Sequence, residues 1–363
     1  MPKYRTALGL GFCGMLLLSE ATNCHPITLS PVADQFMLGY VTGATSPLTG
    51  HVVVRWALSA PSLDWKDGSF PTGVHPGSGV GIMAGRDGLF RLALTDIAPS
   101  QIEMVWGLGP AIWDNSGLTP AAAPPASSPV GVALDDDSIF AIAYTRSGST
   151  VAVELYKHDT RSFVADLAPQ GGTNTNVEGR PDMVRQGNTV VLVWRRWNGS
   201  TFDLVTSKGT VTGQTLVFSP GTVLPTPTDA QLAAGVESDP AVARTDTKFF
   251  VAAVREEVGG GAGTLHGWRT QVFESPDGVA WTSNAVMGSL DVVNVSQIGL
   301  AGVGGGKVIA VGLKQTTGGN AKLSGAVFDG TSWQAMPTSE LNGMTTSTPS
   351  FRPFALIGVM KNN

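Results

Sequence analysis

The chain has 363 residues, among them 46 Gly and 23 Pro, and 14% of its residues are charged. So much Gly and Pro argues against a helix bundle, because both residues disfavour helix interiors. The 42% of hydrophobic residues supply a core and argue against wholesale disorder. The formal net charge of −5 argues against a general nucleic-acid-binding protein, which needs a basic surface to neutralise phosphates.

The first 21 residues have the three regions of a secretory signal peptide. Two positive charges precede an uncharged, mostly apolar run, Thr6–Leu18, and the small residues Ser19 and Ala21 follow at the positions that determine cleavage. The alternative is a first strand or helix of the folded domain. A secreted, cell-surface or periplasmic protein is therefore expected, with no transmembrane span in the mature chain. The expected division is a signal peptide at 1–21, a lead-in at 22–30 and one folded domain at 31–363.

Cleavage after Ala21 would leave Cys24 as the one cysteine of the mature chain. A lone cysteine excludes an internal disulfide and indicates lipidation, intermolecular pairing or a free thiol. The place of Cys24, directly behind an apolar segment, resembles that of a bacterial lipoprotein cysteine, although Asn23 fits that pattern poorly. Lipid anchoring at Cys24 stays one alternative.

Short apolar runs separated by Gly, Ser, Thr, Asn and Pro follow in chain order, which is the signature of hairpins. These runs are Phe36–Val41, His51–Leu58, Val80–Ala84, Leu89–Leu94, Ile102–Trp106, Ala111–Trp113, Ile139–Tyr144, Val190–Trp194, Phe249–Val254 and Ala355–Val359.

A pattern recurs along these runs at steps of 48 to 59 residues, with copies beginning at Pro31, Gly79, Pro129, Pro181, Pro240, Gln297 and Pro349. Such a period, built from short strands with no helical pattern between them, is typical of a β-propeller. The last copy has no room for outer strands, so we expect a C-terminal strand that closes the ring. The predicted fold is all-β, a single propeller with six blades, or alternatively seven. A pair of β-sandwiches would not explain the steady spacing.

The segment Glu274–Trp281 reads Glu-Ser-Pro-Asp-Gly-Val-Ala-Trp and resembles the Asp-box, or BNR repeat, of sialidase-like propellers. Phe328–Trp333 and Leu63–Gly68 resemble it more loosely. The resemblance implies a structural turn, in which the Asp side chain binds backbone N–H groups, Gly adopts a conformation that is costly for other residues, and Trp packs between blades. The residues in those roles are Ser275, Asp277, Gly278 and Trp281.

The resemblance also implies a Phe/Tyr-Arg-Ile-Pro motif near the start, three arginines that grip a carboxylate, and a Tyr nucleophile paired with Glu. This sequence has no such motif near its start, and Phe351-Arg352-Pro353 lies at the wrong end and lacks the Ile. Tyr156 falls in a third strand, where a half-buried or solvent-facing position is expected. A non-catalytic or divergent member of the superfamily is therefore expected, so whether the chain is an enzyme stays open.

The one pair of carboxylates that the spacing can offer to a glycoside hydrolase is Asp239 with Glu256 or Glu257, because hydrolysis needs two carboxylates across the substrate. The alternative is that Asp239 caps a turn before a strand, as its neighbours Ser238 and Pro240 favour. No cluster has convincing metal-ligand spacing, since the acidic run 135–137 sits at a hairpin turn. No metal or cofactor is expected.

In a propeller, the ends of second strands and the starts of first strands meet on one face near the axis. That face is expected to receive Arg146, Arg180, Asp182, Arg195, Arg196, Arg255 and Lys314, with Asp239 and Glu256 among them. Arginine suits carboxylates and vicinal hydroxyls, so a glycan or a cell-surface protein partner is the expected ligand. The alternatives are ordinary solvated arginines paired with nearby acids, a glycoside hydrolase, and a structural surface or assembly subunit.

Overall fold

The computed structural model describes residues 34–42, 51–58, 65–67, 76–84, 90–96, 102–109, 112–119, 129–134, 139–145, 150–157, 160–166, 178–227, 232–236, 238–257, 268–283, 295–315, 320–336, 345–347 and 354–359. These residues form six antiparallel sheets, and each sheet is named here by the strand at its inner end. No helix long and apolar enough to cross a membrane occurs among them. The predicted signal peptide, the lead-in and Cys24 lie outside the described residues.

Three sheets come from the two ends of the chain and its first half. The β26 sheet contains β26 (Phe354–Val359), β1 (Gln35–Thr42), β2 (His51–Leu58) and β3 (Lys66–Asp67). The β4 sheet contains β4 (Pro76–Ala84), β5 (Phe90–Asp96), β6 (Ile102–Gly109) and β7 (Ile112–Thr119). The β8 sheet contains β8 (Val130–Ala133), β9 (Ile139–Thr145), β10 (Val151–Lys157) and β11 (Thr160–Asp166).

Three sheets come from the second half. The β12 sheet contains β12 (Glu178–Gln186), β13 (Thr189–Trp197), β14 (Phe202–Thr212), β15 (Thr215–Phe218) and β16 (Thr222–Val223). The β17 sheet contains β17 (Ala241–Arg244), β18 (Phe249–Glu256), β19 (Trp268–Ser275) and β20 (Thr282–Ser283). The β21 sheet contains β21 (Val295–Gly302), β22 (Val308–Gln315), β23 (Asn320–Phe328), β24 (Trp333–Ala335) and β25 (Thr345–Ser347).

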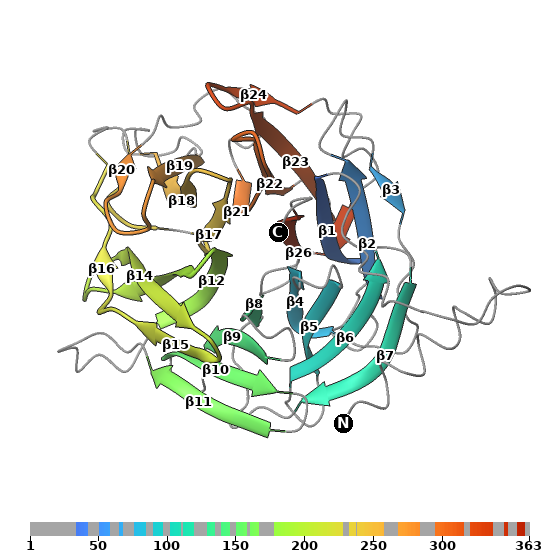
Figure 1. Ribbon diagram of the computed structural model, residues 1–363. Helices are drawn as coiled ribbons and strands as arrows, with labels where there is room; N and C mark the ends of the chain where they lie inside the picture. The colour runs from blue at the N-terminus through green and yellow to red at the C-terminus, as the bar shows by residue number, and fades with distance from the viewer. Residues whose placement is uncertain are drawn as a thin grey trace, which may run out of the picture.

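The inner strands surround a common axis (Figure 1). They contact one another in the order β4, β8, β12, β17, β21, β26 and back to β4, which closes a circle. The all-β, single-propeller prediction is therefore confirmed. The seventh copy of the sequence repeat supplies β26 rather than a sheet of its own. This strand pairs antiparallel with β1 in the register Gln35↔Val359 to Tyr40↔Phe354, so both ends of the described chain share one sheet.

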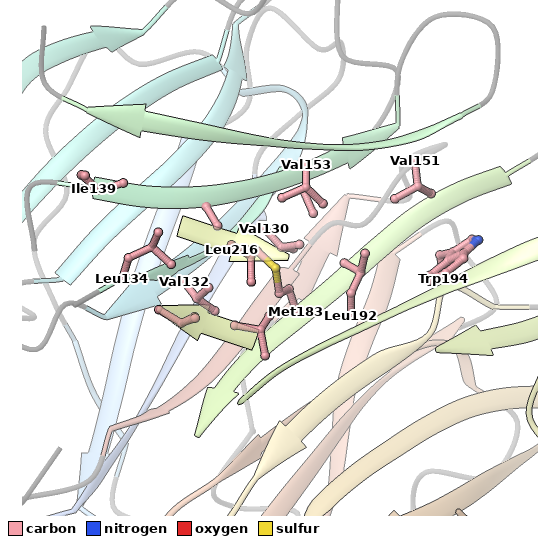
Figure 2. Close-up of a cluster of buried hydrophobic side chains, with 14 of the residues drawn as sticks. Val130, Val132, Leu134, Ile139, Val151, Val153, Met183, Leu192, Trp194 and Leu216 are labelled. Atoms are coloured by element: carbon pink, nitrogen blue, oxygen red, sulfur yellow. The ribbon is translucent and has the colours of Figure 1, made fainter. Parts of the chain in front are cut away.

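Both faces of a sheet are buried because each sheet is packed between two others. Every residue of β9 is buried, and so is every residue of β18 except Glu256, which explains why these strands read as continuous apolar runs in the sequence. Between the β8 and β12 sheets, Val132, Leu192 and Trp194 belong to one buried cluster (Figure 2). Comparable clusters join the β12 sheet to the β17 sheet, and the β17 sheet to the β21 sheet.

Glycines allow the inner strands to approach closely at the axis. A Cβ on Gly302 of β21 would overlap the backbone carbonyl of Arg244 in β17, and a Cβ on Gly358 of β26 would overlap that of Gly302. Gly81 of β4 stands in the same relation to the carbonyl of Pro129, just before β8. The narrow axis therefore depends on residues without a side chain at these positions.

Candidate axial binding site

A cavity of about 340 Å³ lies on the propeller axis, and every inner strand contributes to its lining. β8 contributes along its whole length, and other inner strands contribute residues towards their C-terminal ends, as with Ile82 of β4, Gly302 of β21 and Gly358 of β26. Gly187 and Asn188, which form the exposed turn between β12 and β13, also line it. The cavity therefore opens on the face where inner strands end, which we call the inner-turn face.

Two arginines on neighbouring inner strands line this cavity: Arg185 of β12 and Arg244 of β17. Each stands four residues after the proline that begins its repeat, Pro181 or Pro240. Equivalent positions of adjacent repeats lie at the same height on the axis, so the repeat itself brings the two arginines to the lining of one cavity.

Arg185 is held in place by backbone carbonyls. Its Nη1 donates to the carbonyl of Ala133, at the end of β8, over 2.8 Å, and its Nε donates to the carbonyl of Gly187 over 2.6 Å. These bonds fasten the β12 sheet to the β8 sheet and restrict the rotamers of the side chain. The guanidinium is thus pre-positioned at the cavity wall.

Arg244 is the more enclosed of the two, with 8% of its surface exposed. Burial lowers its pKa from 12.5 to about 10, and repulsion from the Arg185 guanidinium lowers the pKa further in the same direction. Both effects disfavour the charged form of Arg244: burial removes water from the guanidinium, and the neighbouring positive charge of Arg185 repels it.

One carboxylate lies among the described residues that line the cavity, that of Asp182. Its Oδ1 accepts the N–H of Met183 and its Oδ2 accepts the N–H of Val242, each over 2.9 Å. Asp182 therefore joins β12 to β17 through backbone hydrogen bonds. Two arginines and one aspartate leave the described lining with one net positive charge, although the whole chain is acidic.

Further hydrogen bonds tie neighbouring sheets together on the inner-turn face. Gln186 Nε2 donates to the carbonyl of Asp246 over 2.7 Å, and the Asp246 carboxylate accepts the N–H groups of Gly305 and Gly306 over 3.3 and 3.2 Å. Asp34 Oδ2 accepts the N–H of Gly304 over 3.0 Å. These bonds link the β12, β17, β21 and β26 sheets, so the rim of the cavity is braced.

Among the described side chains that the sequence analysis assigned to an axial mouth, that of Asp182 belongs to a residue that lines this cavity. Arg196 lies at the far end of β13, where its Nη2 is 3.9 Å from Asp203 Oδ2. Arg195 lies with its guanidinium carbon 4.6 Å from the centre of the Phe202 ring. The contact between Arg196 and Asp203 matches the alternative given above, an ordinary arginine at a strand end that pairs with a nearby acid. Arg146 lies outside the described residues, and the side chains of Arg180 and Lys314 are not among those described.

Arg255, also expected at a mouth, is 2% exposed. Its Nε donates to Gln271 Oε1 and its Nη1 donates to the carbonyl of Ala234. Burial lowers its pKa to about 10, and the negative charge of Asp203 acts in the opposite direction. Arg255 is therefore an interior residue that joins β18 to Gln271 of β19 and to the backbone at Ala234.

The proposed pair of carboxylates lies outside the described lining of the axial cavity. Asp239 is 0% exposed, and its carbonyl accepts the hydroxyl of Ser238, whose Oγ accepts the N–H of Val254 over 2.9 Å. Glu256 is half-buried at the end of β18, and Glu257 forms an ion pair with Arg269. Neither Asp239 nor Glu256 lines the axial cavity.

The turn at 275–281 has the hydrogen bonds expected of a structural turn. Asp277 Oδ1 accepts the N–H groups of Val279 and Ala280 over 2.9 and 3.0 Å, and Ser275 Oγ accepts the N–H of Gly278 over 2.8 Å. The bonds from Ala280 and Val279 lower the pKa of Asp277. Trp281 packs against the cluster between the β12 and β17 sheets, as expected of an inter-sheet residue.

Tyr156 is 3% exposed, so its expected half-buried or solvent-facing position was wrong. Its hydroxyl donates to Glu154 Oε2 over 3.0 Å, and the hydroxyl of Tyr144 donates to Glu154 Oε1 over 2.5 Å. All three side chains are buried in the β8 sheet, and the two tyrosines belong to the same buried cluster as Met83 of β4. Because Glu154 is 0% exposed and does not line the axial cavity, the group belongs to the interior between two sheets.

The sequence analysis missed Arg185 and Arg244. The signal was present, because both occupy the fifth position of the pattern that begins at Pro181 and Pro240. Arg185 and Arg244 lie at the ends of inner strands, whereas the predicted site residues came from the starts of inner strands and the ends of second strands. Within the part of the chain that the structure describes, no group of three or more His, Cys, Asp or Glu could hold a metal ion.

No model of a known protein family matches the sequence. No curated protein matches it either. Solved structures with a similar course of the chain include a GH93 α-L-arabinofuranosidase of Fusarium graminearum in complex with arabinobiose (13% identity, TM-score 0.45, covering 76% of this chain and 82% of that one). They also include the SapL1 lectin in complex with α-methyl fucoside (10%, 0.45, 78% and 85%) and TolB from Acinetobacter baumannii (8%, 0.45, 90% and 67%). Similarity at this level concerns the architecture of the chain alone.

Proposed function

We propose that the chain is an exported β-propeller that binds a glycan in its axial cavity and does not cleave it. The observation that carries the proposal is the composition of that cavity. Arg185, Arg244 and Asn188 line it together with apolar residues such as Val132 and Leu300. Ligand sites of this kind combine an apolar lining with a few polar groups that fix orientation.

The arrangement of carboxylates favours binding over hydrolysis. A glycosidase of the common type needs two carboxyl groups roughly 5–10 Å apart across the bond that it cleaves. Among the described lining residues, Asp182 supplies one carboxylate, and backbone N–H groups engage both of its oxygens. Asp239, the proposed catalytic base, is fully buried. The alternative ligand is a cell-surface protein partner that inserts a polar segment into the cavity.

We further propose a divergent sialidase-like propeller of six blades, one blade for each sheet. The six sheets whose inner strands contact in a circle support the blade number. The hydrogen-bonded turn around Asp277 supports the Asp-box interpretation. The sequence pattern of the first 24 residues supports export, with lipid anchoring at Cys24 as one alternative.

The proposal is tested on a glycan array with the purified full chain, alongside fluorogenic glycosides incubated with the same preparation. We expect selective binding to a subset of glycans and no release of fluorophore. Asn188→Trp, which narrows the cavity mouth, should abolish the array signal. Gln214→Trp, in the exposed turn between β14 and β15, is the matched control and should retain it. Hydrolysis of a glycoside, or equal array signals for the two variants, would contradict the proposal.

A further inference from the structure

One of the six inner strands, β26, differs from the others in how it is joined to its sheet. The other five inner strands are each followed along the chain by the strand with which they pair. β26 is instead the last strand, and it pairs with β1, which comes from the other end of the described chain. It can therefore leave its sheet without the opening of a hairpin.

β26 also forms part of the wall of the axial cavity. Leu356, Ile357 and Gly358 line this cavity, and all three are half-buried. β12, which contributes Met183 and Val184 to the lining, stands opposite β26 in the circle of inner strands (Figure 1). A ligand that fills the cavity therefore contacts β26 on one side and β12 on the other.

We propose that β26 is a detachable wall of the axial site, so that glycan binding and closure of the propeller are thermodynamically linked. This inference rests on the proposed function and adds its regulation. An occupied cavity holds β26 against β1, and the departure of β26 removes one wall of the site. A ligand that binds the closed state alone shifts the equilibrium towards closure by about the ratio of its concentration to its Kd. By reciprocity, a change that detaches β26 weakens the affinity for the ligand by the same factor.

The rest of the β26 sheet has attachments of its own, so opening can stop at β26. β1 keeps eight paired positions with β2 when β26 leaves. Phe36 and Leu38 of β1 belong to the buried cluster that joins this sheet to the β21 sheet. Asp34, directly before β1, accepts the N–H of Gly304, between β21 and β22, over 3.0 Å. Detachment of β26 therefore opens the cavity while β1 and β2 stay in place.

Hydrogen exchange of the full chain, followed by mass spectrometry, tests the proposal. Without ligand, the amides of β26 should exchange faster than those of β12, because β26 opens locally. The glycan with the strongest array signal is then added at 100 times the Kd that calorimetry gives. It should slow exchange in β26 by about 100-fold, and it should leave exchange in β15, an outer strand, unchanged.

A disulfide between β26 and β1 provides the matched control. Gln35 and Val359 are directly opposite each other in the ladder. Opposite residues of antiparallel strands have Cα atoms about 4.5 or 5.5 Å apart, which a disulfide can span. In the variant with Gln35→Cys, Val359→Cys and Cys24→Ser, oxidation should slow exchange in β26 without any glycan, and the glycan should then add little protection. The same variant after reduction should behave as the unmodified chain does.

The outcomes separate this inference from the proposed function. Exchange in ligand-free β26 as slow as in β12, or no slowing of β26 by a bound glycan, would overturn the linkage and leave glycan binding standing. Full protection of β26 by the glycan in the oxidised variant would overturn it too, because the strand is then already held. A blank array would refute the proposed function and the linkage with it, and ligand-free exchange would still show whether β26 detaches.

Discussion

Gly278 gives the sharpest test of how neighbouring sheets pack. It has φ = 75°, and a Cβ built there would lie 2.6 Å from Cγ2 of Val191 in the β12 sheet. Real Cβ contacts below 3.0 Å are essentially never seen, so Val191 would have to move by at least 0.4 Å. Left-handed backbone costs a residue with a Cβ about 1–2 kcal/mol, and overpacking a well-filled interior costs about 1–3 kcal/mol. Gly278→Ala should therefore lower the free energy of unfolding by about 2–5 kcal/mol.

Gly213→Ala separates the two contributions. Gly213 has φ = 60°, and a Cβ there would meet no atom within 4 Å, so this variant should lose only the backbone contribution, about 1–2 kcal/mol. Urea unfolding at 25 °C measures both variants. Adding Val191→Ala to Gly278→Ala should recover the overlap contribution relative to Val191→Ala alone, as in a double-mutant cycle. Equal losses for Gly278→Ala and Gly213→Ala would refute the inferred contact between the β12 and β17 sheets.

Three further predictions concern Arg255, Asp329 and the C-terminal strand β26. Arg255→Met should lower the free energy of unfolding by about 1–3 kcal/mol, because two buried acceptors lose their donor. The variant should bind an array-selected glycan with unchanged affinity in calorimetry. Weaker glycan binding by the folded variant would contradict a purely structural role for Arg255. Hydrogen bonds from the Thr331 hydroxyl, then from the Ser332 and Thr331 N–H groups, lower the pKa of Asp329 to about 2. The contribution of the Asp329 carboxylate to stability should therefore be complete above about pH 4 and be lost as the pH falls towards 2. Denaturant titrations between pH 2 and 5 should show a weaker pH dependence of the free energy of unfolding for Asp329→Asn than for the unmodified chain. Deletion from Phe354 onward should expose the edge of β1, and light scattering should then detect aggregation on heating. A peptide spanning 350–363, added in trans, should reduce that aggregation. A truncated chain that stays monomeric with an unchanged melting temperature would show that β26 does not close the ring.

The repeat made the architecture predictable because each copy must bury both faces of its sheet. The apolar run Phe249–Val254 falls within β18 (Phe249–Glu256), and Ala355–Val359 lies within β26. The pairing of β26 with β1 followed from the incomplete last copy, since a lone strand at the end of the chain must find an edge.

The site was less predictable because sequence position does not reveal where the axis is narrow. Arg185 and Arg244 line the cavity together with Gly302 and Gly358, two glycines at which the inner strands approach one another closely. Arg255 shows the opposite case. An arginine at the end of a strand reads as exposed, yet Gln271 and the carbonyl of Ala234 satisfy it in the interior.

The most direct test of the account is a crystal structure of the full chain soaked with a glycan that the array selects. The account predicts electron density for the sugar in the axial cavity, beside Arg185 and Asn188. A cavity without sugar density, or sugar density beside Arg195 and Arg196 at the far end of β13, would contradict it.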